Sequence, residues 1–192
     1  PLRTMTKIIL ESIVLTFKKE YHIEIILDNG DDNFLNLNNQ NLIYKNVNIV
    51  MPSNIDELLN IIESIQFGIF MDSGPLHVAK ILNKKGLLIE NSVSSKILLN
   101  KFDSIKVFKN HYSSEYCNAP CGLTNIINYH DNYGCFDSMK INKTIFDDPL
   151  NLNSLQRGRL KKQYKYFVDN PVSCLKQINI LELNKFINGL LK

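Results

Sequence analysis

The segment with the clearest chemical potential is the run Asp72-Ser73-Gly74-Pro75-Leu76-His77, which follows the apolar residues 67–71. Gly74 predicts a tight turn, and Pro75 predicts a helix start, because its missing N–H would be unpaired there anyway. Helix N-termini bind anions through free N–H groups and the positive end of the dipole. A glycine lets a ligand approach the backbone, and His77 adds a donor one turn into the helix. The segment therefore predicts a phosphate or nucleotide site.

The same residues are also typical of helix punctuation without any ligand. Asp72 and Ser73 are common helix caps, and glycine and proline often mark a turn before a helix. Local physics alone leaves both interpretations open.

A second group of reactive side chains lies further along the chain. Three of the four cysteines fall within 19 residues, with two histidines close by. The group consists of Cys117, Cys121 and Cys135, together with His111 and His130, while the fourth cysteine, Cys174, lies further along the chain. Thiolates and imidazoles are preferred zinc ligands, but the spacing differs from two tight Cys-x2-Cys pairs. A metal site, a disulfide and free or buried thiols remain alternatives, while a disulfide scaffold is excluded because the cysteines are too sparse.

The elements expected to position these residues alternate between strand and helix. Strands are expected at residues 23–27, 47–51, 67–71, 86–89 and 105–108. Helices are expected at residues 6–20, 76–82, 154–168 and 180–191. A further helix is expected to begin after Ser53, with Ser53 as its N-cap and Asp56 as its capping acid. Residues 33–46 are ambiguous. Residues 23–27, apolar except for Glu24, are expected to form a strand buried on both faces. The order predicts an α/β fold, a Rossmann-like parallel sheet with flanking helices, in which ligands bind beyond the carboxyl ends of the strands.

Composition excludes several classes of protein. The chain has 192 residues, 44% of them hydrophobic and 21% charged, which is ordinary for a globular protein and excludes wholesale disorder. Its longest apolar runs are far shorter than the ~20 residues of a membrane helix. The net charge of +3 and the lack of a basic stripe argue against nucleic-acid binding. The 25 Asn, 24 Ile and 19 Lys, against 3 Arg and 2 Ala, indicate codon bias, so a single Lys or Asn carries little information.

The octapeptide Asp72-Ser-Gly-Pro-Leu-His-Val-Ala79, preceded by an apolar strand, resembles the hallmark motif of glycosyltransferase family 9. These are the heptosyltransferases that build the inner core of bacterial lipopolysaccharide. The residues that lead to Gly30 and Asp32, the run that starts at Pro52, and Lys7 also resemble family features in the same order. The cysteine-containing segment and residues 178–187 resemble the family's tail more loosely.

The resemblance implies the C-terminal, donor-binding half of a GT-B glycosyltransferase. That half would bind a nucleoside diphosphate sugar, similar to ADP-heptose, for transfer to a lipopolysaccharide or glycan acceptor, with no resident cofactor or metal. Position by position, the resemblance implies that backbone groups contact the diphosphate and that Asp72 holds the turn or contacts the sugar. It also implies that His77 contacts the anion, that Lys7 contacts a phosphate and that Asp32 contacts the ribose. The backbone contacts are those of Ser73, Gly74, Pro75 and Leu76. The backbone at 52–54 would lie near the base, and the protein would act in the cytoplasm, at the inner face of the membrane.

The chain also departs from the family pattern. Glu90 stands where the family has a Gly-Pro-rich turn, and a carboxylate near a diphosphate is repulsive, so Glu90 must point away or the donor must bind differently. The family's N-terminal acceptor half, with the presumed base, has no counterpart, and Pro1 is expected near the junction between halves. We therefore expect a Rossmann-like core at 1–110, a cysteine-containing loop region at 111–150 and a helical extension at 151–192. The alternatives are another GT-B enzyme, similar to a nucleotide-sugar epimerase, and a non-catalytic α/β binding module.

Overall fold

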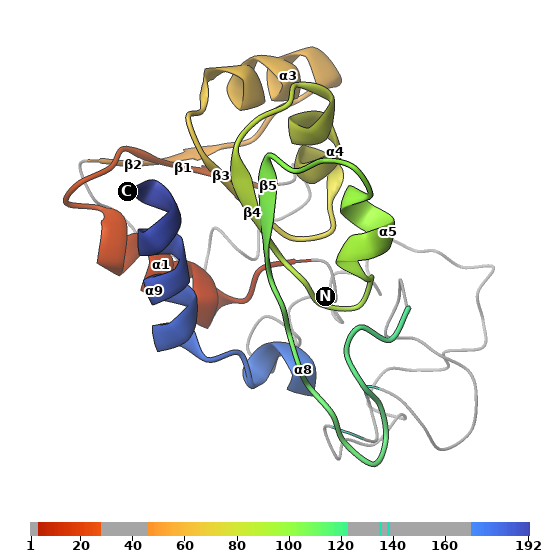
Figure 1. The fold of residues 1–192 in the computed structure, drawn as a ribbon. Coiled ribbons are helices and arrows are strands. Elements are labelled where there is room, and N and C mark those ends of the chain that lie inside the picture. Colours follow the sequence, from red (N-terminus) through yellow and green to blue (C-terminus); the bar gives the residue numbers. More distant parts are fainter. Residues whose placement is uncertain (1–3, 28–45, 123–134, 136–137, 139–169) are drawn as a thin grey trace, which may run out of the picture.

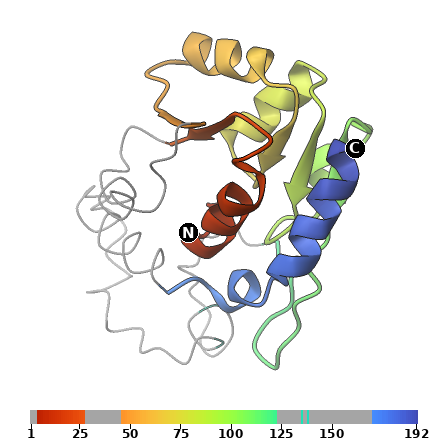
Figure 2. The same ribbon diagram turned by 90° about the vertical axis from the view of Figure 1, so that its left-hand side faces the viewer.

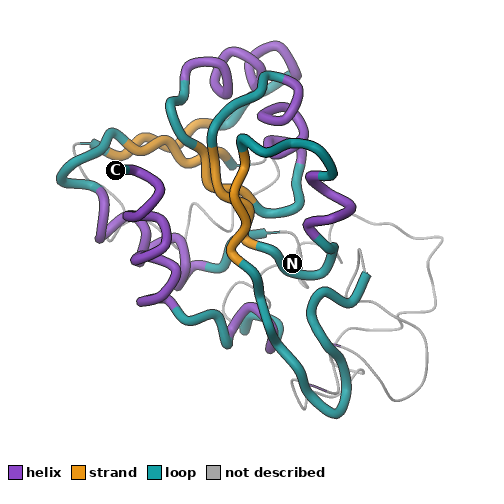
Figure 3. The backbone as a smooth tube through the Cα atoms, in the orientation of Figure 1, coloured by secondary structure: helices purple, strands orange, loops and turns teal. Residues whose placement is uncertain are grey.

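The computed structural model describes residues 4–27, 46–122, 135, 138 and 170–192, and these form an α/β fold (Figure 1). Short parallel strands lie between helices (Figure 3), an arrangement compatible with a Rossmann-like fold. The strands are β1 (Ile23–Ile26), β2 (Val47–Val50), β3 (Gly68–Phe70), β4 (Gly86–Ile89) and β5 (Ile105–Phe108). The helices are α1 (Lys7–Phe17), α3 (Ile55–Ser64), α4 (Gly74–Ile81), α5 (Ser95–Leu99), α8 (Ser173–Lys176) and α9 (Ile180–Leu191).

The strands form two parallel sheets. One sheet pairs β1 with β2, and the other has the order β3-β4-β5. In the second sheet Phe70 is in register with Leu88, and Leu88 is in register with Val107. Because all three strands run the same way, the loops after β3, β4 and β5 leave from one edge of this sheet. The segment that begins at Asp72 leaves from that edge.

Strand β4 separates two hydrophobic cores, because successive side chains of a strand point to opposite faces. Leu87 and Ile89 pack into a core with α1 and α9, whereas Leu88 packs into a core with α3, α4 and α5. All four residues of β4 are buried, so the strand is covered on both faces. Each fully buried aliphatic side chain stabilises the fold by roughly 1.5–3 kcal/mol.

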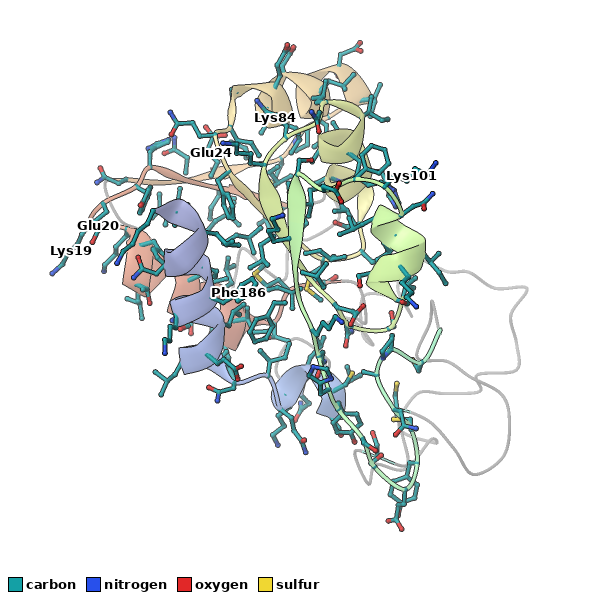
Figure 4. All side chains as sticks on the ribbon, in the orientation of Figure 1. Lys19, Glu20, Glu24, Lys84, Lys101 and Phe186 are labelled. Carbon is teal, nitrogen blue, oxygen red and sulfur yellow. The ribbon has the colours of Figure 1, made fainter. Side chains whose placement is uncertain are left out.

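The C-terminal helices complete the first core. Helix α9 lies against α1 (Figure 2), and Asn184 donates hydrogen bonds to the hydroxyls of Ser12 and Thr16 across this contact. Phe186 points from α9 towards β5 (Figure 4), where its ring meets Phe108 edge-on with centroids 5.8 Å apart. The described part of the expected C-terminal extension therefore shares a core with the strands.

Two glycines allow the close pairing of β3 and β4. Gly68 and Gly86 are paired across the strands, and the ring of Phe70 covers both. A Cβ atom on Gly86 would lie 2.6 Å from the backbone oxygen of Gly68 and 2.7 Å from the Phe70 ring. These positions therefore exclude a side chain for packing reasons.

Most of the expected elements are confirmed, and two details of the sequence analysis are wrong. Residues 23–27 are not buried on both faces, since Glu24 is exposed in β1 and the sheet of β1 and β2 is only partly covered. The N-cap of α3 is Asn54 rather than Ser53, and the capping acid is Glu57 rather than Asp56. The short helices α5 and α8 were not expected. The helix expected at 154–168 and the ambiguous stretch at 33–46 lie outside the described residues. No helix in the described parts of the chain is long and apolar enough to cross a membrane.

The packing around β4 generates a matched stability prediction. We expect Gly86→Ala to lower the free energy of unfolding by roughly 1–3 kcal/mol, because the added methyl group meets rigid backbone. Gly74→Ala should change it by less than about 0.5 kcal/mol, because its Cβ meets no atom of the described chain within 4 Å. Urea unfolding followed by circular dichroism measures both variants. Equal losses would contradict this account of the β3–β4 contact.

Candidate functional site

The candidate site is the N-terminus of α4, at the carboxyl end of β3. Ser73 is the N-cap residue, with extended backbone, and Pro75 lies in the first turn. The Ser73 hydroxyl does not cap the helix; it donates to the carbonyl oxygen of Met71 at 3.3 Å. The first turn contains no acidic residue. The positive end of this helix dipole therefore has no side-chain cap and no carboxylate in its own first turn.

Asp72 and His77 flank this turn. The His77 Nε2 atom lies 3.8 Å from Asp72 Oδ1, which is longer than a hydrogen bond. The His77 side chain is 49% exposed and that of Asp72 is 12% exposed. The imidazole therefore faces solvent at the mouth of the site, and the carboxylate lies further inside.

The backbone of the turn gives fewer donors than the resemblance implies. Pro75 has no N–H, and the N–H of Leu76 donates to the Ser73 carbonyl oxygen at 3.1 Å. The Leu76 side chain is fully buried in the core with α3 and α5, so this residue anchors the helix. The Gly74 amide belongs to the first turn, where an N–H has no intrahelical acceptor. Since a Cβ on Gly74 would meet no atom of the described chain within 4 Å, the space above this amide is open.

The N-terminus of α3, in contrast, is closed by side-chain hydrogen bonds. The Asn54 side chain accepts from the Glu57 N–H at 2.9 Å, and Glu57 accepts from the Ser53 N–H at 2.7 Å and the Ser53 hydroxyl at 2.9 Å. These hydrogen bonds lower the pKa of the Glu57 carboxyl below its ordinary value of 4.5. Side chains also cap α1, α5 and α9. Among the described helices of eight or more residues, α4 alone lacks a side-chain cap.

The Glu90 side chain is hydrogen-bonded to the start of another helix, α5. Its side chain is buried, and Oε1 accepts from the Ser95 N–H at 2.6 Å. The carboxylate thus faces the N-terminus of α5. This contact gives the Glu90 carboxylate a partner within the fold, and its effect on an anion bound at α4 stays a prediction.

A pocket lies at the carboxyl end of β2, against the start of α3. Its volume is about 350 Å³, and its lining is mainly apolar. The lining residues are Val50, Met51, Pro52, Glu57, Asn60 and Ile61. Pro52, the first of the residues 52–54 expected near a nucleotide base, thus lines this pocket.

The described contacts do not connect the two remaining predicted donor-binding residues, Lys7 and Asp32, to this site. Lys7 opens α1, which covers the opposite face of the sheet from α4, and its Nζ lies 3.8 Å from Glu11. Asp32 lies outside the described residues. The phosphate contact of Lys7 and the ribose contact of Asp32 therefore stay predictions.

The cysteines are all free thiols, with Cys121 exposed, Cys117 half-buried, and Cys135 and Cys174 buried. Burial, followed by the charges of neighbouring cysteines, raises the pKa of the Cys135 and Cys174 thiols to about 12. No group of three or more potential ligands is placed to hold a metal ion within the described ranges. His111 is exposed, and His130 lies outside the described residues.

Sequence reasoning missed a set of buried polar side chains that follow β4 and β5. Asn110 donates to the Cys174 carbonyl oxygen at 2.8 Å and to Asn91 at 3.4 Å. The hydroxyl of Ser92 is buried without a hydrogen-bond partner among the described contacts. Two asparagines were easy to overlook in a chain with 25 of them, although their position after two buried strands was a usable signal.

Comparison of the chain with protein-family models, with curated proteins and with solved structures gives no match.

The α3 cap generates a pH-dependent prediction. Because the folded-state pKa of Glu57 is lowered, its stabilising effect is complete above the unfolded pKa and is lost as the pH falls through the folded value. We expect Glu57→Gln to lower the thermal midpoint near neutral pH, and the difference from the wild type to vanish in acid. Calorimetric scans across this pH range measure it, with Glu63→Gln in the last turn of α3 as the control. A pH-independent difference would contradict the assignment.

Proposed function

We propose that this chain binds a nucleoside diphosphate sugar at the N-terminus of α4, as the donor-binding part of a glycosyltransferase. The observation that carries the proposal is the open first turn of α4, which lies at the carboxyl end of a buried parallel strand. Helix N-termini in this position are favoured sites for phosphate groups. The resemblance of residues 72–79 to the motif of glycosyltransferase family 9 supports the same ligand class.

Each part of the proposed ligand has a counterpart on the described surface. The diphosphate would accept a hydrogen bond from the Gly74 amide and a second from His77, which is half-exposed beside it. The base would enter the apolar pocket beside Met51 and Pro52. The sugar would lie nearest Asp72, whose carboxylate borders the turn. A heptose-like sugar and an adenine base follow from the family resemblance alone.

The proposed chemistry is transfer of the sugar from the nucleoside diphosphate to an acceptor hydroxyl, with a lipopolysaccharide or glycan as acceptor. The reaction places growing negative charge on the leaving diphosphate, and fixed donors aimed at that charge lower the barrier. In this proposal Gly74 and His77 supply those donors without a metal ion. The base that deprotonates the acceptor would come from an acceptor domain, and the proposed setting is the cytoplasmic face of a membrane.

Donor binding tests the proposal directly. We expect ADP-sugars or UDP-sugars to bind the wild-type chain in calorimetric titrations, and Gly74→Val to abolish binding, because the side chain would occupy the space above the amide. His77→Ala should raise the Kd by roughly fivefold or more, the equivalent of one lost hydrogen bond of about 1 kcal/mol.

The matched control is Gly189→Val in α9, since a Cβ there also meets no atom of the described chain within 4 Å. This variant should bind the donor as the wild type does. A wild-type chain that binds neither sugar nucleotide, with no effect of His77→Ala, would sink the proposal. Unfolding of Gly74→Val would show instead that the turn has a structural role.

A further inference from the structure

Segments that are far apart in the sequence place three of the four thiols in or against one hydrophobic core. Cys135 and Cys174 are buried in the same hydrophobic core, and Cys117 packs against that core. The Ser138 hydroxyl donates to the Ser173 hydroxyl, which in turn donates to the Ser138 carbonyl oxygen. These two bonds hold Ser138, three residues after Cys135, against α8, which carries Cys174.

Cys121 is connected to the segment that contacts Cys174 through its neighbour Gly122. The Gly122 N–H donates to the Ser92 carbonyl oxygen at 2.7 Å. The adjacent residue, Asn91, accepts a hydrogen bond from the Cys174 thiol at 3.1 Å. Two consecutive residues of one loop thus contact the residue after Cys121 and the sulfur of Cys174. The charge of Cys121 is also the largest single-residue influence that raises the pKa of Cys174.

The thiols differ sharply in their access to solvent. Cys121 is exposed, whereas Cys174 is buried. Cys117 is turned into its own loop, where the Ser114 hydroxyl lies 4.0 Å from its sulfur and also accepts the Cys117 N–H at 3.1 Å. Cys121 is therefore the thiol that a dissolved oxidant meets first, and Cys174 is a protonated thiol held behind it.

We propose that Cys121 and Cys174 form an oxidation site, at which a hydroperoxide converts the two thiols into an intramolecular disulfide. Neither the family resemblance nor the proposed donor site requires this reaction. Its consequence is a covalent link between the loop that contains residues 113–122 and α8.

The reaction balances in two steps. The Cys121 thiolate attacks the O–O bond of the hydroperoxide, forms an S–O bond and releases an alkoxide or hydroxide, which leaves as the alcohol or water after protonation. The Cys174 sulfur then attacks the Cys121 sulfur, forms the S–S bond and expels hydroxide, which takes the Cys174 proton and leaves as water. The two thiols lose two electrons, and these reduce the peroxide.

Peptide mapping of the full chain tests the proposal. The folded protein is treated with hydrogen peroxide, unfolded, alkylated with iodoacetamide, digested and analysed by mass spectrometry. We expect one reducible cross-link between the peptides of Cys121 and Cys174, with Cys117 and Cys135 alkylated. Cys121→Ser should abolish the link, and Cys117→Ser should leave it unchanged. Both substituted positions are at least partly solvent-accessible, so these variants keep the test valid even if Cys174→Ser does not fold.

Three outcomes would overturn the proposal. The first is that all four thiols remain reduced after exposure to peroxide, so that iodoacetamide alkylates all of them. The second is a disulfide between Cys117 and Cys121, which would place the reactive pair within one loop. The third is a bound metal ion, found by elemental analysis of protein purified without chelator, that protects the four thiols from peroxide.

Discussion

The burial of β4 on both faces is the constraint on which the rest of the structure depends. Leu87 and Ile89 anchor the core with α1 and α9, and Leu88 anchors the core with α3, α4 and α5. Because β3 and β5 both pair with this strand, their carboxyl ends are fixed relative to one another. The turn before α4, the carboxylate of Glu90 and the amide of Asn110 therefore leave the sheet at defined positions along one edge.

That edge uses its polar residues in two different ways. After β4 and β5 they are consumed internally: Glu90 accepts from the start of α5, and Asn91 and Asn110 bond to each other and to α8. After β3 the Ser73 hydroxyl also bonds within the fold, to Met71, but it does not cap α4, and a Cβ on Gly74 would meet open space. The N-terminus of α3 is capped by side chains and that of α4 is not, and this difference supports the proposed binding site at α4. The same edge carries the proposed thiol pair, because α8 and the loop that contains residues 113–122 both contact the residues after β4.

The sequence predicted the elements well where hydrophobic pattern and punctuation agreed. The strands at 86–89 and 105–108 and the helix at 180–191 are confirmed at the expected residues, because short apolar runs and a strong helical period leave few alternatives. The predictions from the sequence were wrong where tertiary contacts determine the structure. In residues 23–27 the charged side chain of Glu24 indicated an exposed position, and the prediction of a strand buried on both faces overlooked it. Neither the one-residue shift of the α3 cap nor the role of Glu90 follows from spacing alone. The cysteine cluster was foreseen as a group of neighbours, but Cys174 joined it only through packing of α8. The roles of Lys7 and Asp32 depend on a bound donor and stay predictions.

The central claim is that the open N-terminus of α4 holds the diphosphate of a sugar nucleotide. Amide chemical-shift mapping during titration with an ADP-sugar tests this most directly, because it reports where the ligand lies rather than whether one binds. The account predicts saturable shifts that are largest at Gly74 and His77, with the amides of α9, including Gly189, unmoved. Saturable shifts confined to other parts of the chain, or no shifts at Gly74 and His77 at saturating ligand, would contradict it.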